Sequence, residues 1–459
     1  MIRERKSLLL FFLGTFALLV GGRYIGAFPK ISQPLNSTTD SVIWNVGLNR
    51  PFLHRGSNSE VLLNLKIKGQ EFSSHERAPV NLVLVIDRSG SMSDSGKLEY
   101  AKDAAKTIIS GLASEDRLSV VAYSTGVQLL YPIQYLRDKE RAILVVDSLY
   151  PTNSTNLSGG LIMGIDQLTS IEGSDNINRV ILLSDGLANV GITNVDELSR
   201  VASQAAERGI HVTTMGLGLH YDENLMMNLA EYGAGNYYFI ESPTQLAGIF
   251  KKEFGQMLAT VAKNSVINLS LSPEVELKEI FGYTHTTKDG FIQINLGDLH
   301  SGQERNILIK LNAPTGSIGK HQLVNASLEF TDILNNNRNV KLEKELAYQV
   351  TEDKSKVRAN EDKKISARGV SVNAAYDLYR AVTEYEKGNR RDALSKVKRA
   401  LNSVVEINNS PQKSDDTIKQ EDVLRGLMED LAEEAPAPGS ASGKKIIKEY
   451  KAEAREQQK

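Results

Sequence analysis

Residues 82–91 read LVLVIDRSGS, an unbroken apolar run that ends directly in an aspartate followed by two serines at alternate positions. A continuous apolar run of this length is typical of a strand that is buried on both faces, as in parallel sheets covered by helices. The segment after it, residues 97–112, carries apolar side chains at helical spacing. A buried strand followed by an amphipathic helix predicts the first unit of an α/β fold.

The same alternation of strand and helix continues to residue 258. Strands are predicted over 118–123, 179–183, 211–216 and 236–240, and helices over 139–149, 158–171, 195–208, 223–231 and 243–258. Strands that alternate with helices form parallel sheets. We therefore expect an α/β domain over residues 79–258, with a doubly wound, mostly parallel sheet covered on both faces.

Short strands are predicted on both sides of this domain. Residues 260–351 hold six short stretches of strand character, at the spacing expected of an antiparallel β-sandwich. The β-rich segment 28–78 has further strand signals between residues 41 and 68. We expect this segment to complete the sandwich, so that the α/β domain is inserted in it or flanked by it.

The last hundred residues are predicted to be helical and then flexible. A charged linker over 352–364 leads into residues 365–434, where apolar side chains at helical spacing predict a helical hairpin and a further helix. Residues 435–459 begin with APAPGSASG and continue with mixed charges. This composition predicts a flexible polar tail.

The composition of the chain excludes several classes of protein. Its 459 residues are 41% hydrophobic and 24% charged, which is typical of a globular protein with two or three domains. The formal charge of −2 argues against a protein that coats nucleic acid. Cysteine is absent, which excludes disulfides, thiol nucleophiles, Cys-ligated zinc and iron–sulfur clusters.

The N-terminus has the composition of an export signal. Arg3, Arg5 and Lys6 precede the apolar run 8–20, which is shorter than the roughly 20 apolar residues that a membrane-spanning helix needs. Residues 1–27 are therefore predicted to be a signal peptide, with an uncleaved N-terminal membrane anchor as the alternative. In both cases we expect the rest of the chain to lie outside the cytoplasm, as a periplasmic, cell-surface or secreted protein.

Oxygen-bearing side chains lie where the predicted loops meet one edge of the sheet. Asp87, Ser89 and Ser91 follow the strand 82–86, Thr155 precedes a predicted helix, and Asp185 follows the strand 179–183. In open α/β sheets ligands bind at the carboxyl ends of the strands. Hydroxyl and carboxylate oxygens suit Mg²⁺, with Mn²⁺ or Ca²⁺ as alternatives. The competing structural explanation is that these side chains only cap turns.

This set of residues resembles the metal-ion-dependent adhesion site of the von Willebrand factor type A domain. That family has an Asp-x-Ser-x-Ser loop, a distant Thr and a distant Asp-Gly, and each element occurs here in the same order. The order along the chain, with strands first, then the α/β domain, further strands and finally helices, also resembles that of bacterial relatives of inter-alpha-trypsin inhibitor heavy chains and of proteins labelled calcium-activated chloride channels.

The resemblance implies a role for each residue of the set. The two serines would coordinate the metal directly, the threonine directly or through water, and the two aspartates at least partly through water; in order, these are Ser89, Ser91, Thr155, Asp87 and Asp185. It also implies a free coordination position for an acidic residue of a partner protein. No pore-forming spans accompany these motifs, so the channel label does not imply conduction.

Three functions remain open after these observations. The first is metal-dependent binding of an acidic residue on another protein, as in cell adhesion, without enzymatic activity. The second is an assembly or structural factor, tethered to the membrane, that works through its helical region. The third is an unrecognised hydrolase, for which the chain offers little: His75-Glu76 begins an HExxH-like stretch, but Pro79 replaces the second histidine, and no Gly-x-Ser-x-Gly or phosphate-binding loop occurs.

Overall fold

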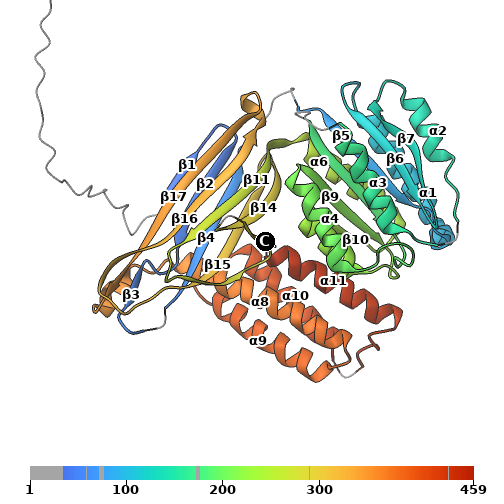
Figure 1. Cartoon of the computed structure of the whole chain (residues 1–459). Coiled ribbons are helices and arrows are strands. Elements are labelled where there is room, and N and C mark those ends of the chain that lie inside the picture. The colour runs from blue at the N-terminus through green and yellow to red at the C-terminus, as the bar shows by residue number, and fades with distance from the viewer. Residues whose placement is uncertain are drawn as a thin grey trace, which may run out of the picture.

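The structure is a computed structural model of the whole chain (Figure 1). It describes residues 35–57, 59–71, 77–152, 154–171, 176–288, 290–432 and 434–458. The predicted signal peptide or anchor, residues 1–27, lies outside the described residues.

The α/β domain is built on a six-stranded sheet in the order β10-β9-β8-β5-β6-β7. All neighbouring pairs are parallel except β6 and β7, which form an antiparallel edge. The strands are β5 (Val80–Asp87), β6 (Arg117–Tyr123), β7 (Val127–Tyr135), β8 (Ile177–Ser184), β9 (Ile210–Leu217) and β10 (Ala234–Ile240). Every residue of β5 and β9 is buried, which explains why most of their side chains are apolar, although Asn81 and His211 are buried polar exceptions.

Helices cover both faces of this sheet. One face packs against α1 (Lys97–Gly111), α2 (Lys139–Asp147) and α6 (Leu246–Leu258), together with the short helices η1 (Gly90–Gly96) and η2 (Pro243–Gln245). The other face packs against α3 (Leu157–Thr169), α4 (Val195–Glu207) and α5 (Glu223–Tyr232). The predicted doubly wound, mostly parallel sheet is confirmed.

A β-sandwich lies beside the α/β domain, as Figure 1 shows. Its five-stranded sheet consists, in spatial order, of β1 (Leu35–Thr38), β2 (Val42–Leu48), β4 (Glu60–Gly69), β15 (Glu304–Asn312) and β12 (Glu276–Ile280). Its six-stranded sheet consists of β13 (Thr286–Lys288), β14 (Phe291–His300), β11 (Thr260–Leu271), β16 (Gly319–Asp332), β17 (Arg338–Thr351) and β3 (Phe52–His54), and η3 (Ile333–Asn335) joins β16 to β17.

The sandwich is assembled from both sides of the α/β domain. β4 precedes that domain in the chain and pairs antiparallel with β15, which follows it, over nine consecutive residue pairs. Both sheets contribute to one apolar core, in which Trp44 is completely buried. The α/β domain is therefore inserted between the two parts of a sandwich, as expected from the strand signals on either side of it.

The C-terminal region is helical and contains more than a hairpin. It consists of α7 (Lys354–Ala359), α8 (Lys363–Glu386), α9 (Arg390–Asn408), α10 (Asp415–Asp430) and α11 (Ala441–Gln458). In Figure 1 these helices lie against both the sandwich and the α/β domain. The short helix α7 forms within the segment 352–364, which was expected to be a linker.

The structure corrects the expectation of a flexible tail over residues 435–459. Most of this segment is α11, which packs against α8 and buries two isoleucines, Ile446 and Ile447. Lys448 and Lys451 are only 3% and 1% exposed, and both reach Glu223 of α5, at 2.8 and 3.1 Å. The polar composition was misleading because charged side chains can be buried when a carboxylate from elsewhere in the chain pairs with them.

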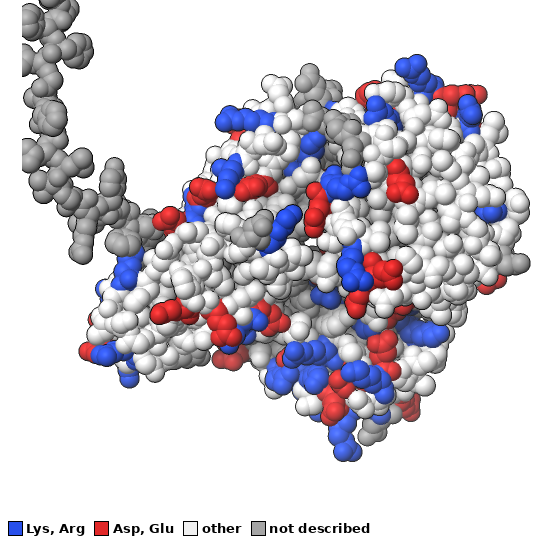
Figure 2. All heavy atoms as spheres, viewed as in Figure 1, with Lys and Arg blue, Asp and Glu red and all other residues white. Residues whose placement is uncertain are grey.

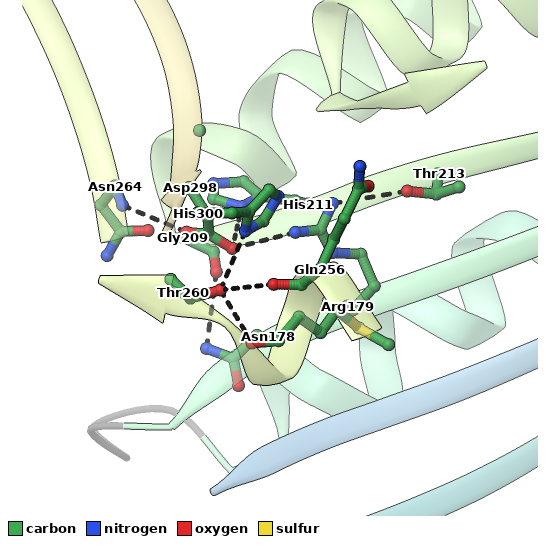
Figure 3. A network of polar contacts seen from close by, with 12 residues as sticks. Asn178, Arg179, Gly209, His211, Thr213, Gln256, Thr260, Asn264, Asp298 and His300 are labelled. Atoms are coloured by element: carbon green, nitrogen blue, oxygen red, sulfur yellow. Dashed lines mark hydrogen bonds and ion pairs between the residues drawn. The ribbon is translucent and has the colours of Figure 1, made fainter. Parts of the chain in front are cut away.

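A buried polar network joins the central sheet to the sandwich (Figure 3). Arg179 of β8 lies 2.9 Å from Asp298 of β14 and 3.6 Å from Glu253 of α6. His211 of β9 lies 3.1 Å from the same carboxylate of Asp298. Burial by itself would raise the pKa of Asp298, but the charges of His211 and Arg179 outweigh it and hold the pKa below its ordinary value.

His300 at the end of β14 makes stability depend on pH. Burial, reinforced by the charge of Arg179, lowers the pKa of His300 to about 4 from its ordinary 6.5. Between these values the unfolded chain binds a proton that the folded chain does not, so stability falls as the pH falls through this window. When the pH falls from 7 to 5, we expect the free energy of unfolding of the wild-type protein to decrease by about 2 kcal/mol more than that of the His300→Gln variant. Urea unfolding at the two pH values measures both decreases. Equal losses in the two proteins would contradict this role of His300.

The surface carries both charges in close mixture. Figure 2 shows lysine and arginine interspersed with aspartate and glutamate over the visible face, without a large field of one sign. Within the described ranges, no helix combines the length and apolarity that a membrane span requires.

Candidate metal centre

Three loops meet at the carboxyl edge of the central sheet. β5 and β8 are parallel neighbours with Ile86 opposite Leu183, so Asp87 and Asp185 leave the sheet at the same edge. The loop that precedes α3 brings Thr155 to this edge, where its backbone N–H donates to the side chain of Asn189, in the segment after β8. Asn156 caps α3 by accepting from the N–H of Gly159. The fold therefore positions all three loops from buried elements.

Hydrogen bonds link four of the five predicted site residues. Ser91 Oγ donates to Asp185 Oδ1 at 2.7 Å, and the hydroxyl oxygens of Ser89 and Ser91 are 3.2 Å apart. Asp87 accepts from the backbone N–H of Ser89 at 2.8 Å and from the hydroxyl of Ser184 at 2.9 Å. Both aspartates are completely buried, whereas Ser91 remains partly accessible.

Gly186 shows that the fifth residue, Thr155, belongs to the same cluster. A Cβ atom at Gly186 would lie 3.2 Å from Thr155 Oγ1, 3.5 Å from Ser91 Oγ and 3.9 Å from Ser89 Oγ. The three hydroxyls therefore surround a single point next to the Gly186 backbone. The structure brings together all five residues that the sequence singled out.

Replacing Gly186 by alanine is expected to weaken Mg²⁺ binding by about 10- to 100-fold. The new methyl group would stand between the three hydroxyls, while every oxygen-bearing side chain of the cluster stays in place. The backbone at Gly186 is outside the left-handed region, so alanine itself is tolerated there. Calorimetric titration with Mg²⁺ measures the effect.

Gly126→Ala is the matched control for this substitution. Gly126 lies between β6 and β7 at the same edge of the sheet, and its added methyl would meet no atom within 4 Å. Wild-type affinity in Gly186→Ala would show that the space between the hydroxyls is not a metal site.

The electrostatics of the cluster favour a cation. Burial raises the pKa of Asp87 to about 6, and the nearby charge of Asp185 adds to this effect. Lys97, at the start of α1, donates from Nζ to Asp185 Oδ2 at 2.7 Å. Two carboxylates and one ammonium leave one negative charge uncompensated in a buried place. A divalent cation there would remove this penalty and would stabilise both carboxylates in their charged form.

The oxygen ligands also indicate the class of metal. Three hydroxyls and two carboxylates are hard ligands of low total charge, which suits Mg²⁺ or another oxygen-preferring divalent cation. Within the part of the chain that the structure describes, no group of three or more His, Asp or Glu side chains could hold a metal.

Lys97 is the site residue that the sequence reasoning did not identify. It lies ten residues after Asp87, at the first position of α1, where a lysine usually reads as part of a solvated helix surface. It is buried here, with 8% of its surface exposed. Lys97 follows the Asp-x-Ser-x-Ser loop closely in the chain, which was the only hint in the sequence. Nothing in the sequence shows that its charge meets Asp185, 88 residues away.

The comparison with protein families agrees with this geometry. Residues 81–252 match the von Willebrand factor type A domain, a class that commonly serves as a metal-dependent protein-interaction module. A solved structure of a von Willebrand factor type A protein from Catenulispora acidiphila superposes with a TM-score of 0.72 at 18% identity, over 92% of this chain and 98% of that one. The similarity to this structure concerns the fold alone.

Curated relatives share part of the chain. Protein YfbK of Escherichia coli K12, itself uncharacterised, is 29% identical over 276 residues, which are 58% of this chain and 47% of YfbK. The chain thus spans about half the length of this relative. Inter-alpha-trypsin inhibitor heavy chain H2 of the mouse is 25% identical over 41% of this chain and 21% of its own length. The Arabidopsis thaliana protein WAV3, named an E3 ubiquitin-protein ligase, is 27% identical over 56% of this chain and 34% of its own length.

Proposed function

We propose that this chain, whose residues 81–252 match the von Willebrand factor type A domain, captures an acidic side chain of a partner protein through a divalent metal ion held at the carboxyl edge of its central sheet. The residues proposed to hold the ion are Asp87, Ser89, Ser91, Thr155 and Asp185. When bound, the ion supplies a concentrated positive charge and a coordination position for a carboxylate.

The observation that carries this proposal is the convergence of three hydroxyls beside Gly186, next to two buried carboxylates. Ser91 and Gly186 are both partly exposed, so the cluster is open to solvent on one side. A ligand of the ion can approach from that side without any rearrangement of the core. A divalent ion would also change the charge balance of the cluster from net negative to net positive, which attracts a carboxylate.

The proposal is tested with blocked synthetic peptides that carry one glutamate or, as the control, one glutamine. We expect the glutamate peptide to bind in Mg²⁺ and to be released by a chelator, and the glutamine peptide to bind in neither condition. Fluorescence anisotropy of a labelled peptide gives the dissociation constants. Binding of both peptides alike, or glutamate binding that survives the chelator, would contradict metal-mediated capture.

A second candidate is an assembly factor that works through the helical region. Helices α8 to α11 share an apolar core of their own, and Val370 of α8 and Ile418 of α10 expose their side chains on its surface. If this region is the working surface, Ile418→Asp should reduce the capture of the biological partner and leave the binding of Mg²⁺ and of the glutamate peptide unchanged.

We propose an exported location for this activity, on the basis of the N-terminal sequence alone. A signal peptide that is removed gives a mature chain that begins near residue 28, whereas an anchor leaves the full chain at the membrane. Mass spectrometry of the protein purified from its own cells distinguishes the two.

A further inference from the structure

Arg88 is a buried arginine beside the candidate metal centre, and no carboxylate of the described residues pairs with it. Only 7% of its surface is exposed, and its Nε is buried without a hydrogen-bond partner. Within the described ranges, its guanidinium forms no ion pair or hydrogen bond, and its Cζ lies over the ring of Tyr150, 5.3 Å from the ring centroid. A buried guanidinium is costly unless an anion pairs with it.

Other buried cations of the chain show what Arg88 lacks. Arg179 lies against Asp298 and Glu253, and Lys448 and Lys451 lie against Glu223. In each case a carboxylate from a distant segment compensates the buried charge. Among the described residues, no such carboxylate pairs with Arg88, although its side chain is buried next to the metal loop.

The position of Arg88 places it next to the metal centre and not in it. Asp87 and Ser89 belong to the metal cluster, and Arg88 stands between them in the chain. Its carbonyl oxygen accepts from the N–H of Thr152, and its guanidinium stacks on Tyr150. Both contacts are with the loop that carries Thr155, so the side chain of Arg88 lies on that side of the metal centre.

Two exposed apolar side chains border the same edge. Tyr150 is 63% exposed and begins the loop that leads to Thr155, and Leu187 is 59% exposed and follows Gly186 directly. Large exposed apolar groups at the rim of a polar site are typical of protein interaction surfaces. Arginine and tyrosine are also the residue types that contribute most to such surfaces.

We propose that Arg88 binds a second acidic side chain of the partner segment whose first acidic side chain is held by the metal. The side chains of Tyr150 and Leu187 would contact the residues of the segment that lie between or beside these two acidic residues. This inference rests on the proposed function and specifies its partner as a protein segment with two carboxylates. The charge of the guanidinium, its planar fork and the absence of a carboxylate partner among the described residues all fit a carboxylate.

The test extends the peptide experiment to blocked peptides that carry two glutamates at several spacings. In Mg²⁺ we expect at least one of them to bind the wild-type protein about tenfold more tightly than the peptide with one glutamate. Arg88→Gln should remove this advantage and leave the affinities for Mg²⁺ and for the one-glutamate peptide unchanged. Arg88→Lys, which keeps the charge but loses the fork, should retain part of the advantage.

Arg117→Gln is the matched control. Arg117 also stacks on an exposed tyrosine, Tyr135, at 4.4 Å, but it begins β6 and so lies at the opposite edge of the sheet. This variant should behave as the wild type with every peptide. Thermal unfolding of each variant shows whether it is folded.

The outcomes separate this inference from the proposed function. If the one-glutamate peptide binds in a metal-dependent way but a second glutamate brings no gain at any spacing, or if Arg88→Gln keeps the gain, the role of Arg88 is refuted and metal-mediated capture stands. If the wild-type protein binds neither Mg²⁺ nor the one-glutamate peptide, the proposed function itself fails.

Discussion

Asp87→Ala is expected to lower the affinity for Mg²⁺ by more than about 100-fold, to the point where calorimetry no longer detects binding. Asp87 supplies one of the two buried carboxylates of the cluster, and its Oδ1 and Oδ2 also hold the Ser89 backbone and the Ser184 hydroxyl in place. The substitution therefore removes a negative charge and the support of a neighbouring ligand at once. Asp87→Ala should therefore weaken metal binding more than the removal of any single hydroxyl of the cluster would.

Asp94→Ala is the control for charge and position. Asp94 lies in η1, seven residues after Asp87, and its side chain is exposed. Its removal should leave the Mg²⁺ affinity near the wild-type value. If Asp87→Ala bound Mg²⁺ as well as Asp94→Ala does, the assignment of the metal centre would be wrong.

Arg179→Met is expected to lower the free energy of unfolding by about 3 to 5 kcal/mol. Arg179 is the guanidinium that compensates Asp298 and Glu253 where the α/β domain meets the sandwich, and all three side chains are nearly fully buried. Methionine fills much of the same volume but leaves two buried carboxylates without this cation. The midpoint of urea unfolding measures the loss.

Arg399→Met provides the comparison for an exposed pair. Arg399 of α9 pairs with Asp377 at 2.8 Å, but most of its side chain is in solvent. Such pairs contribute at most about 1 kcal/mol. Losses of similar size in Arg179→Met and Arg399→Met would mean that the buried network does not hold the two domains together.

The central fold and the cluster at its edge were predictable from short stretches of sequence. The run 82–86 and the strand that ends at Leu183 are apolar because both of their faces are covered, and this pattern needs no knowledge of distant residues. The rule that the carboxyl ends of parallel strands share one edge then places Asp87 and Asp185 together. Each step depends on local pattern and general geometry.

The features that the sequence did not reveal depend on pairs of charges far apart in the chain. Residues 435–459 were predicted to be a flexible tail because of their APAPGSASG stretch and mixed charges, yet Lys448 of α11 reaches Glu223 across 225 residues. Arg179 of the predicted strand 179–183 and Asp298 are separated by 119 residues, and no sequence pattern indicates that they pair. The burial of Arg88 was equally hidden, because only the structure shows it.

The central claim, a divalent metal site at the carboxyl edge of the sheet, is tested most directly by titrating Mg²⁺ calorimetrically into the wild-type protein and into Gly186→Ala. We expect one Mg²⁺ ion to bind per wild-type chain. In Gly186→Ala we expect much weaker binding, because a methyl group then stands between the hydroxyls of Ser89, Ser91 and Thr155. Absence of binding in the wild type, or equal binding in the two proteins, would contradict it.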